Sequence, residues 1–259
     1  MYLFFFDSSF VLYFLSFVVF VCITIFKPRA GQAASGLLAA AAICSFIAVI
    51  VRWGELGYPP VSNLHETLVL FALFLAAASL TADRLRITDN GLAGYASFFC
   101  LVFFGYASLQ DAGIRPLMPA LKSNWLLIHV VSYFLGYSAC FVAFVAGVMH
   151  LAGPGKDDPD YLYKTDVLGR KAVMIAFPLL TAGLSTGAVW ANTAWGRYWG
   201  WDPKETCALV TWLVYVYYLH ARNAKPAGFS AALAVFGFAS VLFTFLGAGL
   251  FFNGFHSYR

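Results

Sequence analysis

One segment of the chain, residues 190–206, gathers the side chains best suited to hold a flat, apolar ligand. Its indole rings offer faces on which such a ligand can stack, and glycines at 196 and 200 let the backbone lie close to a ring. An aromatic belt at a membrane–water interface is the alternative explanation, but it leaves the dense clustering and the glycines unexplained. We therefore expect a ligand platform, and four of the seven tryptophans lie here: Trp190, Trp195, Trp199 and Trp201.

The end of this segment carries the signature of a helix start. Asp202 fits an N-cap, Pro203 the first helical position and Glu205 the third, which together form a capping box. The pattern therefore favours a structural role for Asp202. A capped helix start with Arg197 and Lys204 nearby is also suited to bind a ligand carboxylate, so the two interpretations are compatible.

Two histidines flank this segment in the sequence. His129 is expected about one turn inside its helix, with Trp125 and Tyr133 four residues away on the same face. His256 follows the last apolar stretch. Each could simply reach the lipid headgroups, but two imidazoles beside an aromatic platform suit the ligation of a haem iron by two histidines. We expect that role for both.

The other three histidines have weaker signals. His220 lies near the opposite end of a later helix, where it is either a ligand or a side chain that reaches the membrane surface beside Arg222. His150 falls at a helix end on that same side, and is either a partner for His220 or a satisfied interfacial histidine. His65 follows a possible N-cap at Asn63. The roles of His65 and His150 stay open.

The composition requires a membrane around these residues. Of 259 residues, 61% are hydrophobic, 19% are aromatic and only 11% are charged, and the mean hydropathy is +0.78. An ordinary soluble domain carries about 25% charged residues on its surface. A chain with so few cannot cover itself in water, so we expect an integral membrane protein.

Charge and cysteine usage exclude several other classes. The net charge of +4 is spread along the chain without a basic run, which gives no support for nucleic-acid binding. The five cysteines stand singly, with no CxxC pair, so a thiol oxidoreductase, a zinc module and covalently attached haem are excluded. Buried structural thiols are expected instead. Asp7 interrupts the first apolar stretch, which has no basic start, so we expect no cleavable signal peptide.

The apolar stretches predict an all-α bundle of about eight transmembrane helices, because each is close to the roughly 20 residues that cross a bilayer. We expect one polytopic membrane domain over 1–259, without an inserted soluble domain. The predicted spans are 6–26, 33–51, 64–82, 91–109, 125–152, 171–191, 205–222 and 228–252.

The distribution of basic residues predicts the orientation of these spans. With the N-terminus outside, the inner loops hold the majority of the 16 lysine and arginine residues, and Arg52 falls in an outer loop. An even number of spans also returns the C-terminus to the outside. The tryptophan-rich segment 190–206 then faces the extracytoplasmic side, together with His129 and His256.

The sequence WGRYWGWDPKE at 195–205 resembles the tryptophan-rich haem-handling family of cytochrome c biogenesis, and within it the CcsA (ResC) group. Three more segments are similar to that family: YPPVSNLHET at 58–67, SNWLLIHVVSYFLGY at 123–137 and FHSY at 255–258. The resemblance covers roughly residues 58–259. It departs at His65, where the family commonly has an aromatic residue, so no role is carried over to that position.

The resemblance implies a set of haem-binding residues. His129 and His256 match the outer pair of iron ligands, and His220 matches one ligand of a transmembrane site whose second ligand comes from the companion protein CcsB (ResB). It implies no acid–base catalytic residue. The residues expected to contact the haem are Trp125, Trp195, Gly196, Arg197, Tyr198, Trp199, Trp201 and Asp202.

The function that the resemblance implies is haem export and covalent attachment of haem to CxxCH apocytochromes c on the extracytoplasmic side. The cofactor would be haem b, both substrate and transported ligand, and the activity that of a holocytochrome c synthase working with CcsB. A thioredoxin-like protein would keep the apocytochrome thiols reduced. The location would be the bacterial cytoplasmic membrane, or the thylakoid membrane in a plastid.

Two other classes of function compete with this one. A b-type di-haem subunit that passes electrons to quinone also uses transmembrane histidines, but it predicts paired histidines at both depths in one chain and no use for the tryptophan-rich segment. A transporter or scaffold subunit would need charge pairs within the membrane or broken helices in two matching halves, and the sequence has neither pattern.

Overall fold

The computed structural model describes residues 1–26, 31–84, 91–153, 155, 157–221 and 224–252. Every regular element in these ranges is helical, and six helices are long and apolar enough to cross a membrane. The predicted class, an all-α membrane protein, is confirmed. The helices that meet both criteria are α1, α2, α3, α5, α6 and the continuous stretch from α8 to α9.

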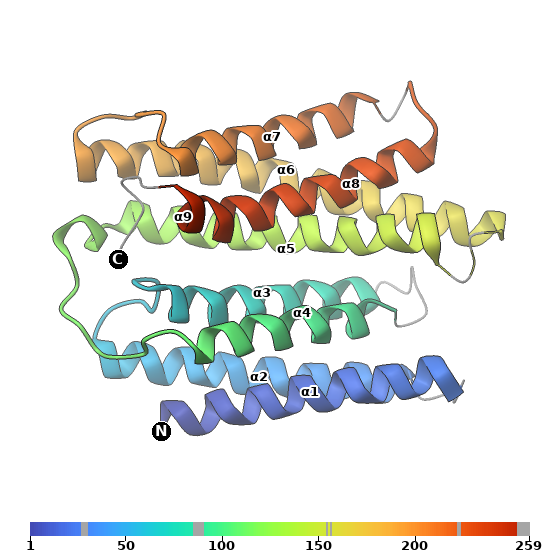
Figure 1. Ribbon diagram of the computed structural model, residues 1–259, viewed down its shortest axis with the longest axis horizontal. Coiled ribbons are helices and arrows are strands. Elements are labelled where there is room, and N and C mark those ends of the chain that lie inside the picture. Colours follow the sequence, from blue (N-terminus) through green and yellow to red (C-terminus); the bar gives the residue numbers. More distant parts are fainter. Residues whose placement is uncertain (27–30, 85–90, 154, 156, 222–223, 253–259) are drawn as a thin grey trace. The chain divides into compact units, whose positions relative to one another are not determined.

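The predicted spans fall on successive helices of the chain (Figure 1). Two of these helices, α4 and α7, fall short of the same criteria of length and apolarity, so the count of eight crossings stays a prediction. The elements are α1 (Tyr2–Phe26), α2 (Gly31–Leu56), α3 (Leu64–Arg84), α4 (Gly91–Ser108), η1 (Pro119–Leu121), α5 (Asn124–Ala152), α6 (Pro159–Trp195), α7 (Pro203–Ala221), α8 (Ala227–Leu242), η2 (Phe243–Gly247) and α9 (Ala248–Phe251).

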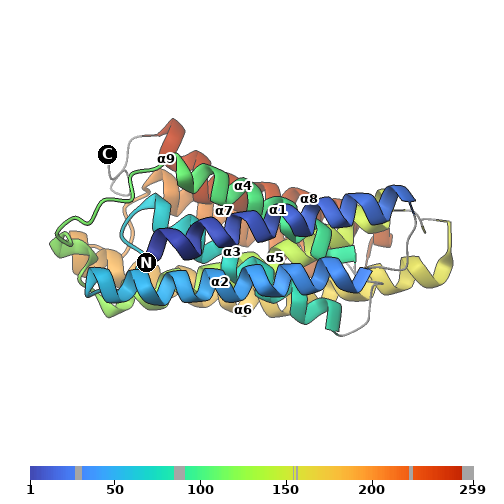
Figure 2. The same ribbon diagram turned by 90° about the horizontal axis from the view of Figure 1, so that it is seen from below.

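Backbone contacts divide the chain into two compact units, Met1–Leu117 and Met118–Arg259. In the first unit, α1 packs against α2 and α4, and α3 packs against α4 and α2 (Figures 1 and 2). Hydroxyl groups join these helices: the Ser16 hydroxyl donates to the carbonyl of Ala34 at 2.8 Å and lies 2.6 Å from the Ser97 hydroxyl. Small polar residues of this kind are typical contacts between helices in lipid.

The first unit also contains a buried ion pair between α2 and α3. Arg52 lies 3.2 Å from Glu66 and donates to the carbonyl of Ala112 at 2.7 Å. Only 4% of Arg52 is exposed, and it lies within α2. The prediction that Arg52 belongs to an outer loop was therefore wrong, because its charge is neutralised inside the bundle and does not contribute to the surface bias.

The second unit carries the tryptophan-rich segment. Its α5 packs along both α6 and α8, and α7 packs against α8 and α6. Ring contacts show that α5 and α8 run in opposite directions, since Phe134 meets Phe245 and Phe141 meets Phe238. The end of α8–α9 therefore lies near the start of α5, as Figure 1 shows for this unit.

Helix α6 begins much earlier than predicted. The span was expected over 171–191, but the helix runs from Pro159 to Trp195. Asp158 caps it by accepting from the backbone of Asp160, and proline occupies the first position. Thirty-seven residues give a rod of about 55 Å, well beyond the ~30 Å hydrocarbon core. The polar stretch read as a loop thus supplies the first turns of this helix.

Candidate haem-binding site

The tryptophan-rich segment comprises the end of α6, a short turn over 196–202, called here the tryptophan-rich turn, and the start of α7. Helix α6 ends at Trp195, where Gly196 adopts a left-handed conformation with φ of 74°. Its N–H donates to the carbonyl of Asn192 at 2.9 Å. A left-handed C-cap favours glycine because that conformation crowds a Cβ, so the sequence Trp-Gly determines where the helix stops.

The capping box predicted at the start of α7 is confirmed. The Asp202 carboxylate accepts from the backbone N–H of Lys204 at 2.9 Å. Glu205 reaches back, and its Oε2 accepts from the backbone N–H of Asp202 at 3.1 Å and of Gly200 at 2.8 Å. Asp202 is buried. These bonds give Asp202 and Glu205 a structural role in shaping the turn.

The indole rings of the segment form two pairs. Trp190 and Trp195 meet edge to face, with ring centroids 5.8 Å apart. Trp199 and Trp201 meet at 5.7 Å and 90°. Trp201 is 70% exposed, whereas Trp190 is only 2% exposed. The first pair therefore belongs to the helix packing, and the second offers ring surface at the edge of the unit.

Other residues predicted to contact a ligand also lie exposed near this turn. Tyr198 is 60% exposed, and Gly196 and Arg197 are exposed beside it. Trp125 is 44% exposed at the start of α5, one turn before His129. A planar ligand at this end of the second unit would meet aromatic surface and a guanidinium group.

His129 contacts two residues of α6 and one of its own helix, α5. Its Nδ1 lies 2.8 Å from the carbonyl oxygen of Gly183. The ring meets Tyr133 edge to face at 4.9 Å and stacks on Trp190 at 6.1 Å and 25°. Because a carbonyl can only accept, Nδ1 carries the proton, and the lone pair of the neutral ring is on Nε2. This tautomer is the usual one for a histidine that ligates a metal through Nε2.

Trp190 connects this histidine with the tryptophan-rich turn. It stacks on His129, meets Trp195, and donates from its indole N–H to the carbonyl of Ala120 at 2.9 Å. Ala120 lies in η1. The structure therefore places His129 beside Trp190, at the start of the tryptophan-rich segment.

His220 lies at the opposite end of α7, 17 residues after Pro203, which is about 26 Å along the helix. Its Nδ1 is 2.8 Å from the carbonyl of Val216, so here too Nε2 bears the lone pair. The side chain is exposed. It shares one face of α7 with three exposed apolar residues spaced three or four apart: Val210, Leu213 and Tyr217.

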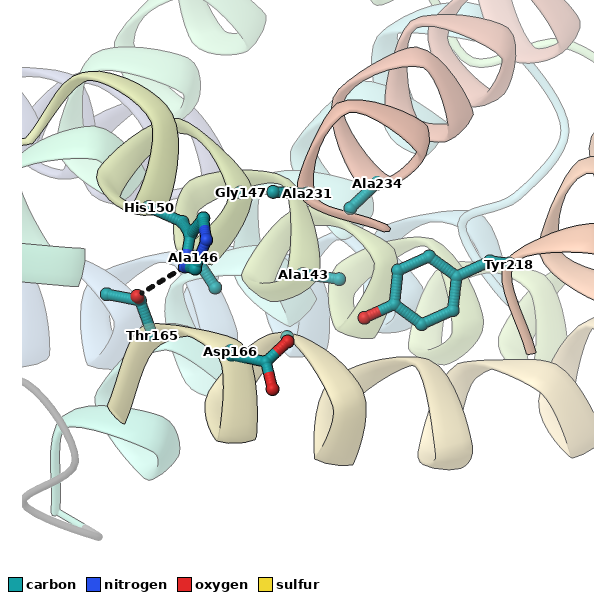
Figure 3. A pocket seen from close by; sticks show the side chains of 10 residues that line it. Ala143, Ala146, Gly147, His150, Thr165, Asp166, Tyr218, Ala231 and Ala234 are labelled. Atoms are coloured by element: carbon teal, nitrogen blue, oxygen red, sulfur yellow. Dashed lines mark hydrogen bonds between the residues drawn. The ribbon is translucent and has the colours of Figure 1, made fainter. Parts of the chain in front are cut away.

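His150 faces a different space from His220. It lines a small cavity between α5, α6, α7 and α8, beside Asp166 and Tyr218 (Figure 3). Its Nδ1 lies 3.1 Å from the hydroxyl of Thr165. The empty volume is about 200 Å³ with open solvent included, below the roughly 300–1,000 Å³ of ordinary ligand pockets. A porphyrin does not fit there.

His65 has a partner at both ring nitrogens. Nε2 lies 2.5 Å from the Tyr2 hydroxyl, and Nδ1 lies 2.8 Å from the carbonyl of Ala107. The predicted N-cap at Asn63 is confirmed, since its side chain accepts from the backbone N–H of Glu66 at 2.9 Å. Packing and hydrogen bonding thus account for His65. His256 lies outside the described residues.

Comparison with protein families shows to which family the chain with this arrangement belongs. A family model described as "Cytochrome C assembly protein" matches residues 61–256, which is most of the chain. This chain belongs to the cytochrome c assembly protein family. The matched range includes the tryptophan-rich turn, His129, His220 and His256, and membership gives the chain a role in cytochrome c biogenesis.

Curated members of this family named "Cytochrome c biogenesis protein CcsA" are similar over most of their length. The protein of Guillardia theta is 36% identical over 247 residues, which cover 83% of this chain and 82% of the relative. That of Synechococcus elongatus is 34% identical over 289 residues, with 89% and 87% covered. That of Chlamydomonas reinhardtii is 34% identical over 250 residues, with 89% and 68% covered.

A solved structure shares the fold of this family member. "Cytochrome c Heme Lyase CcmF" matches with a TM-score of 0.70 and 20% sequence identity. The match covers 95% of this chain and 45% of the CcmF chain. This chain therefore spans less than half the length of CcmF, and the likeness concerns the fold alone.

Part of the surroundings of His129 was not predicted from the sequence. Trp190 was expected only in the platform and Gly183 and Gly187 not at all, although all three contact or line the imidazole ring. One signal was present, because Gly183 and Gly187 form a GxxxG pattern that is typical of closely packed membrane helices. The GxxxG pattern alone does not predict which side chain of the facing helix packs against the two glycines.

Proposed function

We propose that this family member moves haem b across the membrane and attaches it to CxxCH apocytochromes c at the tryptophan-rich turn. The observation that carries the proposal is the tautomer of His129, whose Nδ1–H is engaged by Gly183 while the ring stacks on Trp190. Such a ring is suited to bind iron through Nε2. The CcmF relative is named a heme lyase, which agrees with this activity.

The second outer ligand in the proposal is His256. It follows four residues after Phe252, the last described residue of the chain. Because α8 runs antiparallel to α5, Phe252 lies at the end of the unit where α5 begins and His129 is placed. This placement supports His129 and His256 as a pair of axial ligands beside Trp199 and Trp201.

In the proposed reaction, the protein orients the haem and the apocytochrome thiols. Each apocytochrome thiol adds across a haem vinyl group: a bond forms between sulfur and one vinyl carbon, and the thiol proton goes to the other carbon. No electrons are gained or lost. The protein contributes by holding the iron, stacking the porphyrin and excluding water, which raises the effective concentration of thiol at the vinyl group. No acid–base side chain is proposed.

His220 would serve as a haem ligand at the inner entrance. A histidine beside three lipid-facing apolar residues, Val210, Leu213 and Tyr217, is costly unless it is paired. We propose that a helix of a CcsB (ResB) partner packs along this face of α7 and supplies the second histidine. His150 does not take that position, because it faces the cavity beside Thr165. This arrangement counts against a di-haem electron carrier, which requires paired histidines at both depths.

The proposal includes two further partners and a location. The apocytochrome c is the haem acceptor, and a thioredoxin-like protein keeps its thiols reduced. The membrane would be the bacterial cytoplasmic membrane or the thylakoid membrane of a plastid, with the tryptophan-rich turn on the extracytoplasmic side. The apolar helices support the multi-pass membrane context.

A reporter cytochrome tests this function directly. The chain is expressed with and without CcsB in cells that lack other cytochrome c maturation, and covalent haem on the reporter is measured by haem staining. We expect attachment only with both proteins. Absence of covalent haem with both, while haem still copurifies with the complex, would leave haem binding and contradict the attachment activity.

A further inference from the structure

Two glycines of α6 lie directly beneath rings of α5. A Cβ built on Gly187 would lie 2.4 Å from Nδ1 of His129 and 2.5 Å from its Cε1. A Cβ on Gly183 would lie 2.9 Å from Cγ of the Tyr133 ring. Both distances are shorter than Cβ atoms tolerate, so no larger residue fits at either position without moving a ring.

This use of a GxxxG pair differs from the ordinary one. In membrane helices the pattern usually lets two backbones approach each other. Here the nearest atoms at both glycines belong to the rings of His129 and Tyr133. The carbonyl oxygen of Gly183 also accepts a hydrogen bond from the imidazole N–H of His129 at 2.8 Å. The pair therefore forms a slot in the surface of α6 that receives a histidine and a tyrosine ring.

The imidazole in this slot is confined from several directions. Gly187 lies under the ring, Tyr133 meets its edge, and Trp190 stacks on its face. Trp190 is itself fixed by its hydrogen bond to the carbonyl of Ala120. The rotamer and the tautomer of His129 are thus determined by the fold itself, through contacts that involve no ligand.

We propose that Gly183 and Gly187 are positioning residues, and that their slot sets how tightly and at what reduction potential haem iron is held by His129. This inference rests on the proposed function, because it takes His129 to be a ligand. Neither glycine would touch the haem. Each acts through the imidazole ring, Gly187 by leaving room for it and Gly183 by accepting a hydrogen bond from its Nδ1–H.

Two physical effects follow from such a slot. A ring that is already oriented loses little rotamer freedom when it binds, so the affinity is higher. A carbonyl that accepts a hydrogen bond from Nδ1–H also increases the basicity of Nε2. A more basic Nε2 stabilises the more positively charged ferric iron. Loss of the slot should therefore weaken haem binding and shift the midpoint potential in the positive direction.

The test compares Gly187→Ala with Gly169→Ala in the complex with CcsB. Both glycines lie in α6, but a Cβ on Gly169 would meet its nearest neighbours at an ordinary 3.6 Å. For Gly187→Ala we expect about 10- to 100-fold weaker haem binding at the outer site, as for other residues that support a metal ligand. We also expect partial loss of the low-spin absorbance spectrum and a positive shift of the midpoint potential. Gly169→Ala should match the wild type.

Added imidazole separates a displaced ring from a damaged fold. It should restore the low-spin spectrum of the haem that stays bound to purified Gly187→Ala, because a small ligand can occupy the vacated coordination position while a folded site retains the haem. If Gly187→Ala does not accumulate, Gly183→Ala is measured in the same way, since its Cβ displaces the Tyr133 ring instead of the ligand itself. A variant that folds but is not rescued by imidazole would contradict the slot.

A parallel His129→Ala variant separates this inference from the proposed function. If His129→Ala loses the outer haem spectrum while Gly187→Ala and Gly183→Ala keep the wild-type spectrum and potential, the slot inference is wrong and the ligand role of His129 stands. If His129→Ala keeps the outer haem, His129 is not a ligand, and the proposed site and the slot both fail.

Discussion

Hydrogen bonds at the imidazole nitrogens separate the described histidines of this chain by role. At His129 and His220, Nδ1 meets a backbone carbonyl, so the lone pair of the neutral ring is on Nε2. At His65, both nitrogens have hydrogen-bond partners, one of them the Tyr2 hydroxyl at 2.5 Å. At His65 the Tyr2 hydroxyl meets Nε2, which gives this ring a structural role. At His129 and His220 the carbonyl at Nδ1 leaves the lone pair on Nε2, the nitrogen through which histidine commonly ligates a metal.

Replacing His129 by alanine should abolish haem attachment and leave the protein in the membrane, because the change removes a ligand without adding a larger side chain. Covalent haem on a reporter cytochrome measures the effect, and added imidazole should restore part of it. His65→Phe provides the control, since packing and hydrogen bonds within the first unit account for this histidine. Full attachment by His129→Ala would remove this histidine from the list of essential ligands.

The cap at Asp202 leads to a prediction about stability. Asp202→Ala removes the acceptor for the Lys204 N–H and should lower the free energy of unfolding by about 0.5–2 kcal/mol. Asp202→Ser retains a capping oxygen, so it should restore most of that stability and the attachment activity. Thermal unfolding in detergent measures the first effect. An inactive Asp202→Ser variant of normal stability would instead indicate a direct chemical role for the carboxylate.

At the scale of elements, the sequence predicted best where the signal is local. The capping box at Asp202 and the N-cap at Asn63 each depend on residues within one turn, and both are confirmed. The start of α6 was missed because Asp158 and Pro159 stand in a polar stretch that outweighed their capping signal. The glycine slot was missed because it depends on the register of α5 against α6, which no local pattern contains.

The placement of His220 at the far end of α7 predicts an order of events. His220→Ala should lower haem occupancy at the outer site as well as block attachment, because haem would no longer enter. His129→Ala should instead leave haem bound near His220, since only the later station is lost. The haem content of each variant, purified with CcsB, measures this asymmetry. A His220→Ala complex that fills its outer site normally would exclude His220 as the point of entry.

At the scale of the whole molecule, composition predicted the class of protein, and the resemblance to a family predicted a role in cytochrome c biogenesis. With 11% charged residues, the chain had to be a membrane protein, and its helices are as long and apolar as that class requires. The haem ligands were predicted from motifs, because no composition or periodicity distinguishes His129 from His65. Arg52 shows the limit of charge counting, since a basic residue paired inside the bundle carries no information on orientation.

The orientation of the chain predicts which positions an impermeant thiol reagent can reach. In a cysteine-free background, Arg197→Cys should be labelled from the extracytoplasmic side, because the proposed topology places the tryptophan-rich turn on that side. Tyr163→Cys should be labelled only after the membrane is opened. Both native side chains are exposed, so access to the reagent depends on the side of the membrane. The reverse pattern would invert the topology and place haem attachment on the wrong side.

The left-handed backbone conformation of Trp201 lowers the stability of the fold at a residue whose side chain is proposed to serve haem attachment. Its φ of 55° lies in the left-handed region, a conformation that costs a bulky residue about 1–3 kcal/mol. Glu205 maintains this conformation, because its carboxylate accepts hydrogen bonds from the N–H groups of Gly200 and Asp202 on either side. Asparagine tolerates that conformation better, so Trp201→Asn should raise the melting temperature while it removes the exposed indole ring and reduces attachment. Selection for thermal robustness alone would therefore drive this position away from tryptophan, and a loss of attachment in laboratory-stabilised variants is expected to begin here.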